Sequence, residues 1–252
     1  MDFNKYIADN RAFTTFELLR AFNHSPSIPV ALSRAVKAGK VTRVRQGLYV
    51  SQYGKFLGAK IDPYYLAQAF SPDAVFIYHS ALKLHGIAHS IFNRVQFMTS
   101  EPGPLFFYEG LSYESFAFRD NAQRQAISGR SYASVVTTDR EQTLVDCMAN
   151  LKASGGAEEV IRSFAGLPYV DVDAILYCLT HYPAAVAARV GWYLELNQER
   201  WSVENRSLDT IEGWISKQAS YKLDPAHSKF EAYNSRWRLN LPAPEETIRM
   251  WT

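Results

Sequence analysis

The sequence has few cysteines, little net charge and no long apolar run. Among 252 residues there are two cysteines, and 27 basic side chains against 25 acidic ones give a net charge of +2. Two cysteines in apolar helical patterns, Cys147 and Cys178, exclude a disulfide scaffold and predict buried thiols in a reducing compartment. The longest run without a formal charge, 174–188, is too short to span a bilayer. Residues 1–10 lack the apolar segment of a signal peptide, so we expect a cytoplasmic protein that does not contact a membrane.

Motifs typical of catalytic and metal sites are also missing. The sequence has no glycine-rich phosphate loop, no Gly-x-Ser-x-Gly elbow and no Cys-x-x-Cys pair. His79, His85 and His89 have no carboxylate or thiolate placed to complete a zinc set, so we expect His79 and His85 to be hydrogen-bonded and the protein to bind no metal.

Three carboxylates and one thiol are the remaining candidates for chemistry. Asp139 and Glu141 lie where acids stabilise the first turn of a helix, and Cys147 lacks the flanking charges that lower a thiol pKa. We therefore predict a protein that is not an enzyme and needs no cofactor. The alternative is a metal-dependent enzyme that modifies nucleic acid with Asp139, Glu141 and Asp146.

The near-neutral total hides an uneven distribution of charge. Residues 1–60 contain ten basic and three acidic side chains, a net charge of +7, whereas residues 61–252 carry a net charge of −5. Eight basic residues and no acidic one lie between Arg20 and Lys60. Such a cluster is typical of a surface that meets phosphates. The alternative interpretation is a solvated basic face.

The basic segment predicts three helices and a hairpin. Thr14 and Glu17 form a capping box that starts the second helix. Ser27 is expected to cap the third helix, with Pro29 in its first turn and Gly39 at its end. The expected elements are helices at 2–8, 14–22 and 28–38 and a hairpin at 41–50. This is the order of a winged helix-turn-helix.

We expect the third helix and the hairpin of this module to bind DNA. A helix in the major groove needs polar side chains that reach base edges, and the hairpin needs cations that hold the backbone. The alternative is a winged helix that docks a protein. The predicted DNA-binding residues are Ser27, Ser33, Arg34, Lys37, Lys40, Arg43, Arg45 and Gln46.

Beyond residue 58 the pattern changes to strands followed by helices. Strands are expected at 74–78, 94–98, 105–108, 113–118, 132–138 and 237–241, and helices at 64–70, 79–86, 138–152, 157–165, 172–181 and 184–197. A capping box at 138–141 is expected to start the helix at 138–152. We therefore predict an α+β chain, with a winged helix-turn-helix domain at 1–58 and a larger mixed α+β domain at 59–252.

Motifs in both parts resemble one family. The segments in question are FELL (16–19), LSRAVKAGKV (32–41), RVRQGLYV (43–50), YHSALKLHGI (78–87), TDREQTLVDC (138–147), VGWYL (190–194) and YNSRWRL (233–239). In this order they resemble the AbiEi family, the antitoxin and repressor half of bacterial type IV toxin–antitoxin systems in phage defence.

The resemblance implies a function for each part. It implies that the N-terminal winged helix binds double-stranded operator DNA, with inverted repeats, and represses the protein's own operon. It also implies that the protein counteracts a co-encoded nucleotidyltransferase-like toxin without forming a stable complex with it. A dimer and two monomers on an inverted repeat are equally compatible with the sequence.

Overall fold

The computed structural model describes residues 2–128 and 134–252, which form a mixed α+β fold as predicted. Packing divides the chain into two compact units that do not follow chain order. Unit 1 consists of Met1–Ala74, Asn93–Phe118 and Ser128–Val135, and unit 2 of Val75–Phe92, Arg119–Ile127 and Val136–Thr252. The predicted domain boundary at 58/59 lies within unit 1. The first part of the predicted strand at 132–138 lies outside the described residues.

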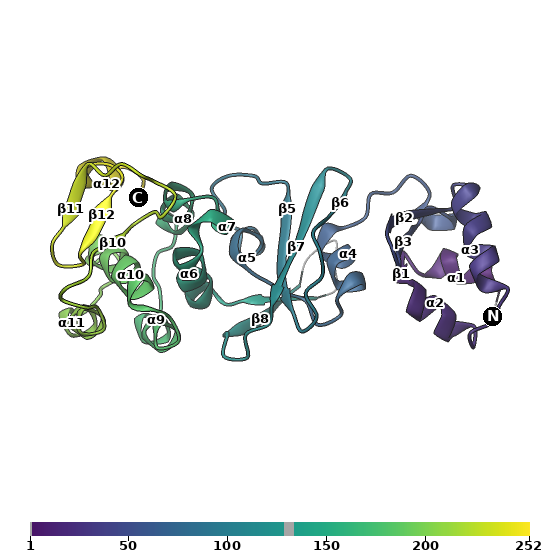
Figure 1. Cartoon of the computed structure of the whole chain (residues 1–252), viewed down its shortest axis with the longest axis horizontal. Helices are drawn as coiled ribbons and strands as arrows, with labels where there is room; N and C mark the ends of the chain where they lie inside the picture. The colour runs from purple at the N-terminus through teal and green to yellow at the C-terminus, as the bar shows by residue number, and fades with distance from the viewer. Residues whose placement is uncertain (1, 129–133) are drawn as a thin grey trace. The chain divides into compact units, whose positions relative to one another are not determined.

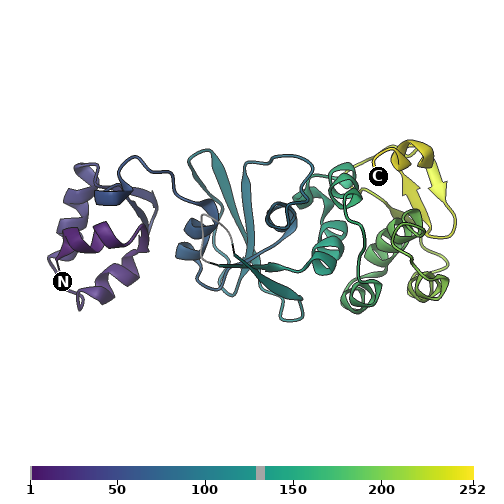
Figure 2. The same ribbon diagram turned by 180° about the vertical axis from the view of Figure 1, so that it is seen from behind.

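The N-terminal part of unit 1 combines three helices with a small antiparallel sheet. The helices are α1 (Phe3–Asp9), α2 (Thr15–Ala21) and α3 (Ile28–Lys37), and the strands are β1 (Ala12–Thr14), β2 (Val41–Arg45) and β3 (Leu48–Ser51). The strand order is β1-β3-β2, and Figure 1 and Figure 2 show the three helices beside these strands. The capping box of Thr14 and Glu17 is present, as predicted. Strand β1 has no counterpart among the predicted elements.

The start of α3 differs from the prediction. Ser27 precedes the helix but makes no side-chain capping bond, and its Oγ lies 2.9 Å from Oγ of Ser25. The cause is the backbone of Ser27, whose φ of −74° and ψ of −21° are already helical, whereas a capping side chain needs an extended backbone. Pro29 lies in the first turn, as predicted. Ile28, Leu32 and Ala35 are buried and attach the helix to the small core of this part.

The rest of unit 1 continues from this module through a single 3-10 turn, η1 (Gly54–Phe56). It contains α4 (Pro63–Phe70), β5 (Arg94–Thr99), β6 (Phe106–Tyr108) and β7 (Leu111–Ala117). Asp62 caps α4 by accepting hydrogen bonds from the amides of Tyr64 and Tyr65. Strand β7 pairs in parallel with β5 and antiparallel with β6.

The described part of unit 2 combines six short strands with most of the helices. Its strands β4 (Val75–Phe76) and β9 (Val135–Thr138) run parallel, and β8 (Arg124–Ile127) lies beside β9. The helices are α5 (Tyr78–Leu84), α6 (Arg140–Ala149), α7 (Leu151–Ser154), α8 (Ala157–Ala165), α9 (Val172–Leu179), α10 (Ala184–Leu196), α11 (Asn205–Gly213) and α12 (Glu245–Arg249). A second small sheet has the order β10 (Tyr221–Lys222), β12 (Leu239–Leu241), β11 (Ala232–Asn234).

The predicted helix at 138–152 and its capping box are partly wrong. Asp139, and not Thr138, caps α6 by accepting a 2.7 Å hydrogen bond from the amide of Gln142. The hydroxyl of Thr138 instead lies 2.8 Å from that of Thr143. The helix ends at Ala149, and α7 follows as a separate turn. No helix among the described residues is long and apolar enough to cross a membrane.

The core of unit 2 depends on the absence of a side chain at Gly191. The indole of Trp237, which is fully buried, lies against the α10 backbone at this position, and a Cβ built on Gly191 would lie 2.1 Å from Cζ3 of Trp237. The ring nitrogen of Trp237 donates a 2.6 Å hydrogen bond to Glu195 at the end of the same helix. Two of the motifs that carry the family resemblance, 190–194 and 233–239, therefore meet here.

We predict that Gly191→Ala lowers the free energy of unfolding by about 3 kcal/mol, because the methyl group overpacks a buried site. Urea denaturation of the full chain measures this change. Gly213→Ala is the matched control, since a Cβ there meets nothing within 4 Å. It should change the unfolding free energy by less than about 1 kcal/mol or raise it. Equal stabilities of the two variants would contradict the packing described at Gly191.

Candidate nucleic-acid interface

A groove of about 390 Å³ lies between α2, α3 and the β2–β3 hairpin. Its floor is apolar, and its polar lining residues are Thr15, Ser33, Lys37 and Arg43, together with the hydroxyl of Tyr49. None of the described residues that line it is acidic. The lining residues are Thr15, Leu18, Leu19, Ile28, Pro29, Leu32, Ser33, Val36, Lys37, Arg43 and Tyr49. Helix and hairpin thus contribute cations to one concave surface.

The structure brings three of the predicted DNA-binding residues into this groove. Ser33 and Lys37 come from α3 and Arg43 from β2, and all three side chains are exposed. Arg34 is exposed on α3, and Gln46 is exposed in the hairpin turn. None of these five side chains forms an ion pair among the described residues, so Lys37, Arg43 and Arg34 keep their charge available to a ligand. Ser27 is exposed before α3.

Two other predicted residues are held against aromatic rings of the same unit. The ammonium of Lys40 lies 4.8 Å from the ring centre of Tyr53. The guanidinium of Arg45 lies 4.7 Å from the ring centre of Phe70 and 5.3 Å from that of Phe106. Both side chains are partly buried. Aromatic rings attract cations electrostatically, so these two residues are less free to move than Arg43.

A third cation of the basic segment is structural. Arg11 is 9% exposed, and its guanidinium donates to the carbonyl oxygens of Ser51, Phe56 and Ala59. These acceptors lie at the end of β3 and in the segment that leads to α4, so Arg11 fixes the path of the chain out of the hairpin. The net charge of +7 therefore overstates the charge that this part offers to a partner.

Sequence patterns missed part of the groove. Thr15 begins α2, Pro29 lies in the first turn of α3, and Tyr49 lies on β3. The alternation of buried Leu48 and Val50 around Tyr49 places the tyrosine on the opposite face of the strand, and that signal was available in the sequence. The position of Thr15 depends on β1, which was not among the predicted elements.

The carboxylate of Asp146 is fully enclosed in unit 2. Arg119 donates two 2.7 Å hydrogen bonds to its two oxygens, the side-chain amide of Gln142 donates one of 2.9 Å, and the hydroxyl of Tyr182 donates another. Asp146 itself has no exposed surface, whereas Arg119 is 31% exposed. Such a saturated carboxylate is a structural ion pair, and it leaves no coordination position for a metal ion.

The other candidates for chemistry are also engaged by the fold. Asp139 caps α6, and burial raises its pKa. Glu141 accepts a 3.1 Å hydrogen bond from the amide of Asp171. Cys147 and Cys178 are buried free thiols, as predicted, and burial raises the pKa of both, that of Cys178 to about 12. A thiol with a raised pKa is a poor nucleophile at neutral pH.

The three histidines considered as metal ligands, His79, His85 and His89, lie in separate environments. The Nε2 atom of His79 is 3.3 Å from the carboxylate of Glu159, and both residues are buried. The Nε2 atom of His85 is 2.8 Å from the carbonyl oxygen of Thr138, and burial lowers the pKa of His85. His89 is exposed. Across residues 2–128 and 134–252, no group of three or more His, Cys, Asp or Glu side chains is arranged to hold a metal ion.

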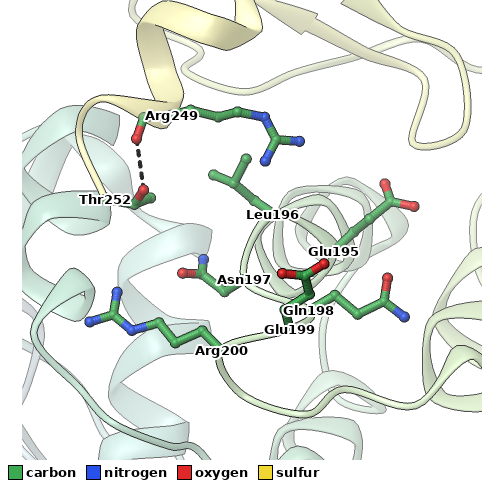
Figure 3. A pocket seen from close by; sticks show the side chains of 8 residues that line it. All are labelled: Glu195, Leu196, Asn197, Gln198, Glu199, Arg200, Arg249 and Thr252. Atoms are coloured by element: carbon green, nitrogen blue, oxygen red, sulfur yellow. Dashed lines mark hydrogen bonds between the residues drawn. The ribbon is translucent and has the colours of Figure 1, made fainter.

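A larger hollow of about 710 Å³ lies in unit 2 where α10 ends near α12 (Figure 3). Figure 3 shows Glu195 turned away from Arg249, and its carboxylate is held by Arg236 and Trp237. Arg249 pairs with Glu245. Glu195 and Arg249, two of its charged lining residues, are therefore paired within the chain. The hollow is lined by Glu195, Leu196, Asn197, Gln198, Glu199, Arg200, Arg249 and Thr252.

Comparison with known proteins supports the fold alone. No family model and no curated protein matches the chain. The chain is similar to a solved structure, the RV2827C protein from Mycobacterium tuberculosis, with a TM-score of 0.65 at 13% sequence identity. The match covers 94% of this chain and 89% of that one. The similarity extends over both units, and at this identity it describes architecture and not activity.

Proposed function

We propose that this protein is a DNA-binding transcriptional repressor whose N-terminal module is a winged helix-turn-helix. The observation that carries the proposal is the groove in which Ser33 and Lys37 of α3 face Arg43 of β2, with no acid in its described lining. The element order α1, β1, α2, α3, β2, β3 and the sheet order β1-β3-β2 are those of a winged helix, which supports the same assignment.

The groove suits the sugar–phosphate backbone of a duplex. Lys37 and Arg43 can each neutralise a phosphate, and the apolar floor suits the deoxyribose between them. Arg34 is exposed on the same helix as Ser33 and can reach a base edge, because arginine pairs in bidentate fashion with guanine. Phosphate contacts supply most of the affinity in this proposal, and α3 supplies the selectivity.

The second part of the proposal is antitoxin activity towards a co-encoded nucleotidyltransferase-like toxin. It rests on the resemblance of the motifs in unit 2 to those of the AbiEi family. Within unit 2 these motifs pack against one another. Segment 190–194 contacts segment 233–239 through Gly191 and Trp237, and segment 78–87 contacts segment 138–147 through the hydrogen bond between His85 and Thr138.

We predict that replacing Arg34 and Lys37 together by alanine weakens binding to the promoter DNA upstream of the protein's own gene. The lost phosphate contact of Lys37 should reduce the slope of log K against log salt by about 0.9, which corresponds to roughly eightfold weaker binding at 0.1 M salt. The lost base contact of Arg34 should cost about 1–3 kcal/mol more without changing the slope. Fluorescence anisotropy titrations at several salt concentrations measure both quantities.

The matched control replaces two exposed cations of unit 2, Lys217 and Lys229, by alanine. This variant should bind like the wild type. Equal effects of the two pairs would mean that the whole surface, and not α3, attracts DNA. A wild-type protein that binds no DNA even at low salt would refute the proposed function and favour a winged helix that docks a protein.

We further predict that the Arg34→Ala, Lys37→Ala double variant keeps its antitoxin activity. DNA binding uses unit 1, whereas the motifs assigned to toxin antagonism lie mainly in unit 2. A growth-rescue assay with toxin and antitoxin expressed from heterologous promoters measures this activity without autorepression. Loss of rescue in a variant that still folds would show that the two functions share a surface.

A further inference from the structure

The β2–β3 hairpin contains an irregularity that separates its two arginines. Arg43 is opposite Tyr49 and Arg45 is opposite Leu48, so Val44 is an extra residue without its own partner. In a regular strand, residues two apart face the same side. The bulge at Val44 breaks this alternation. As a result Arg43 lines the groove beside α3, whereas Arg45 lies against Phe70 and Phe106.

The site that receives Arg45 fits a planar guanidinium. Phe70 of α4 and Phe106 of β6 meet edge to face with their ring centres 5.3 Å apart, and the guanidinium lies over both rings. Its Nη1 atom also lies 3.3 Å from the carbonyl oxygen of Pro104, to which it donates. A Cβ at Gly103 would lie 3.1 Å from the Phe70 ring and 3.5 Å from Nη1 of Arg45, so the missing side chain makes room for this contact.

The aromatic pair is itself anchored in the sheet of unit 1. Phe106 stacks on Tyr113 of β7 with ring centres 4.6 Å apart and nearly parallel planes. Phe70 contacts Phe97 of β5 edge to face at 6.4 Å. Arg45 therefore connects the hairpin to a rigid group of side chains from α4, β5, β6 and β7.

We propose that Arg45 is a positioning residue that fixes the β2–β3 hairpin on α4 and β6, and that it does not contact DNA. The contact sets the orientation of the hairpin and thereby the position of Arg43 across the groove from Lys37. This inference rests on the proposed function, because the effect that we expect from the Arg45 contact is an effect on DNA binding. The contact itself is independent of any ligand.

The test compares variants that keep the charge but lose the planar contact. Arg45→Lys retains one positive charge, yet a lysine ammonium cannot cover two rings and donate to Pro104 in the same way. We expect about tenfold weaker binding to the promoter DNA with an unchanged salt slope, since the number of phosphate contacts stays the same. Phe70→Leu, which removes a ring and no charge, should have the same effect. The double variant should be no weaker than either single variant, because both break one contact.

Arg200→Lys, at an exposed arginine of unit 2, is the matched control for affinity. It should bind DNA like the wild type, because Arg200 lies outside the candidate interface. Wild-type affinity of Arg45→Lys, or a salt slope reduced by about 1 in Arg45→Ala, would overturn the inference, because either result assigns Arg45 to a phosphate.

Hydrogen–deuterium exchange of the full-length chain without DNA tests the contact separately. The amides of 44–47 should exchange faster in Arg45→Lys and in Phe70→Leu than in the wild type, and at the wild-type rate in Arg43→Lys. Unchanged exchange in the first two variants would overturn the inference. A wild-type protein that binds no DNA, with faster exchange in these two variants, would refute the proposed function and leave the positioning role of Arg45 supported.

Discussion

The bulge at Val44 is the local constraint on which the candidate interface depends. It turns one arginine of the hairpin towards α3 and the other towards an aromatic pair of the same unit. One side chain then remains free for a ligand while its neighbour holds the hairpin. A regular strand would place both cations on one face, where they would repel each other and leave the hairpin without an anchor. A single extra residue thus lets Arg43 contribute charge to the groove while Arg45 holds the hairpin.

A comparable constraint organises unit 2. Gly191 allows the Trp237 indole to lie on the α10 backbone, and Glu195 on the same helix accepts hydrogen bonds from Trp237 and from Arg236. The ion pair between Arg119 and the buried Asp146 connects α6 to the chain that precedes β8. Polar groups in this unit are therefore engaged in holding its parts together. The exposed cations of the candidate interface, Arg34, Lys37 and Arg43, lie on α3 and β2 of unit 1.

Local sequence patterns predicted secondary-structure elements, but they did not predict the features that depend on tertiary contacts. The capping box at Thr14, the α+β class and the two buried thiols follow from short-range patterns, and they are present. The capping role of Ser27 was wrong because its backbone is helical. The position of Arg45 could not be inferred, since alternation along β2 holds only as far as the bulge. Strand β1 has three residues, and its pairing with β3 is not encoded in its own sequence. Chain order also concealed that 93–118 belongs to the same unit as the N-terminal module.

The central claim is that α3 and β2 form the surface that binds DNA. Hydrogen–deuterium exchange of the full-length protein, measured with and without the promoter duplex, tests it most directly. We expect the duplex to slow exchange in 28–47 and to leave α9, α10 and α11 of unit 2 unchanged. Binding that slows exchange only in unit 2, with 28–47 unaffected, would contradict the claim.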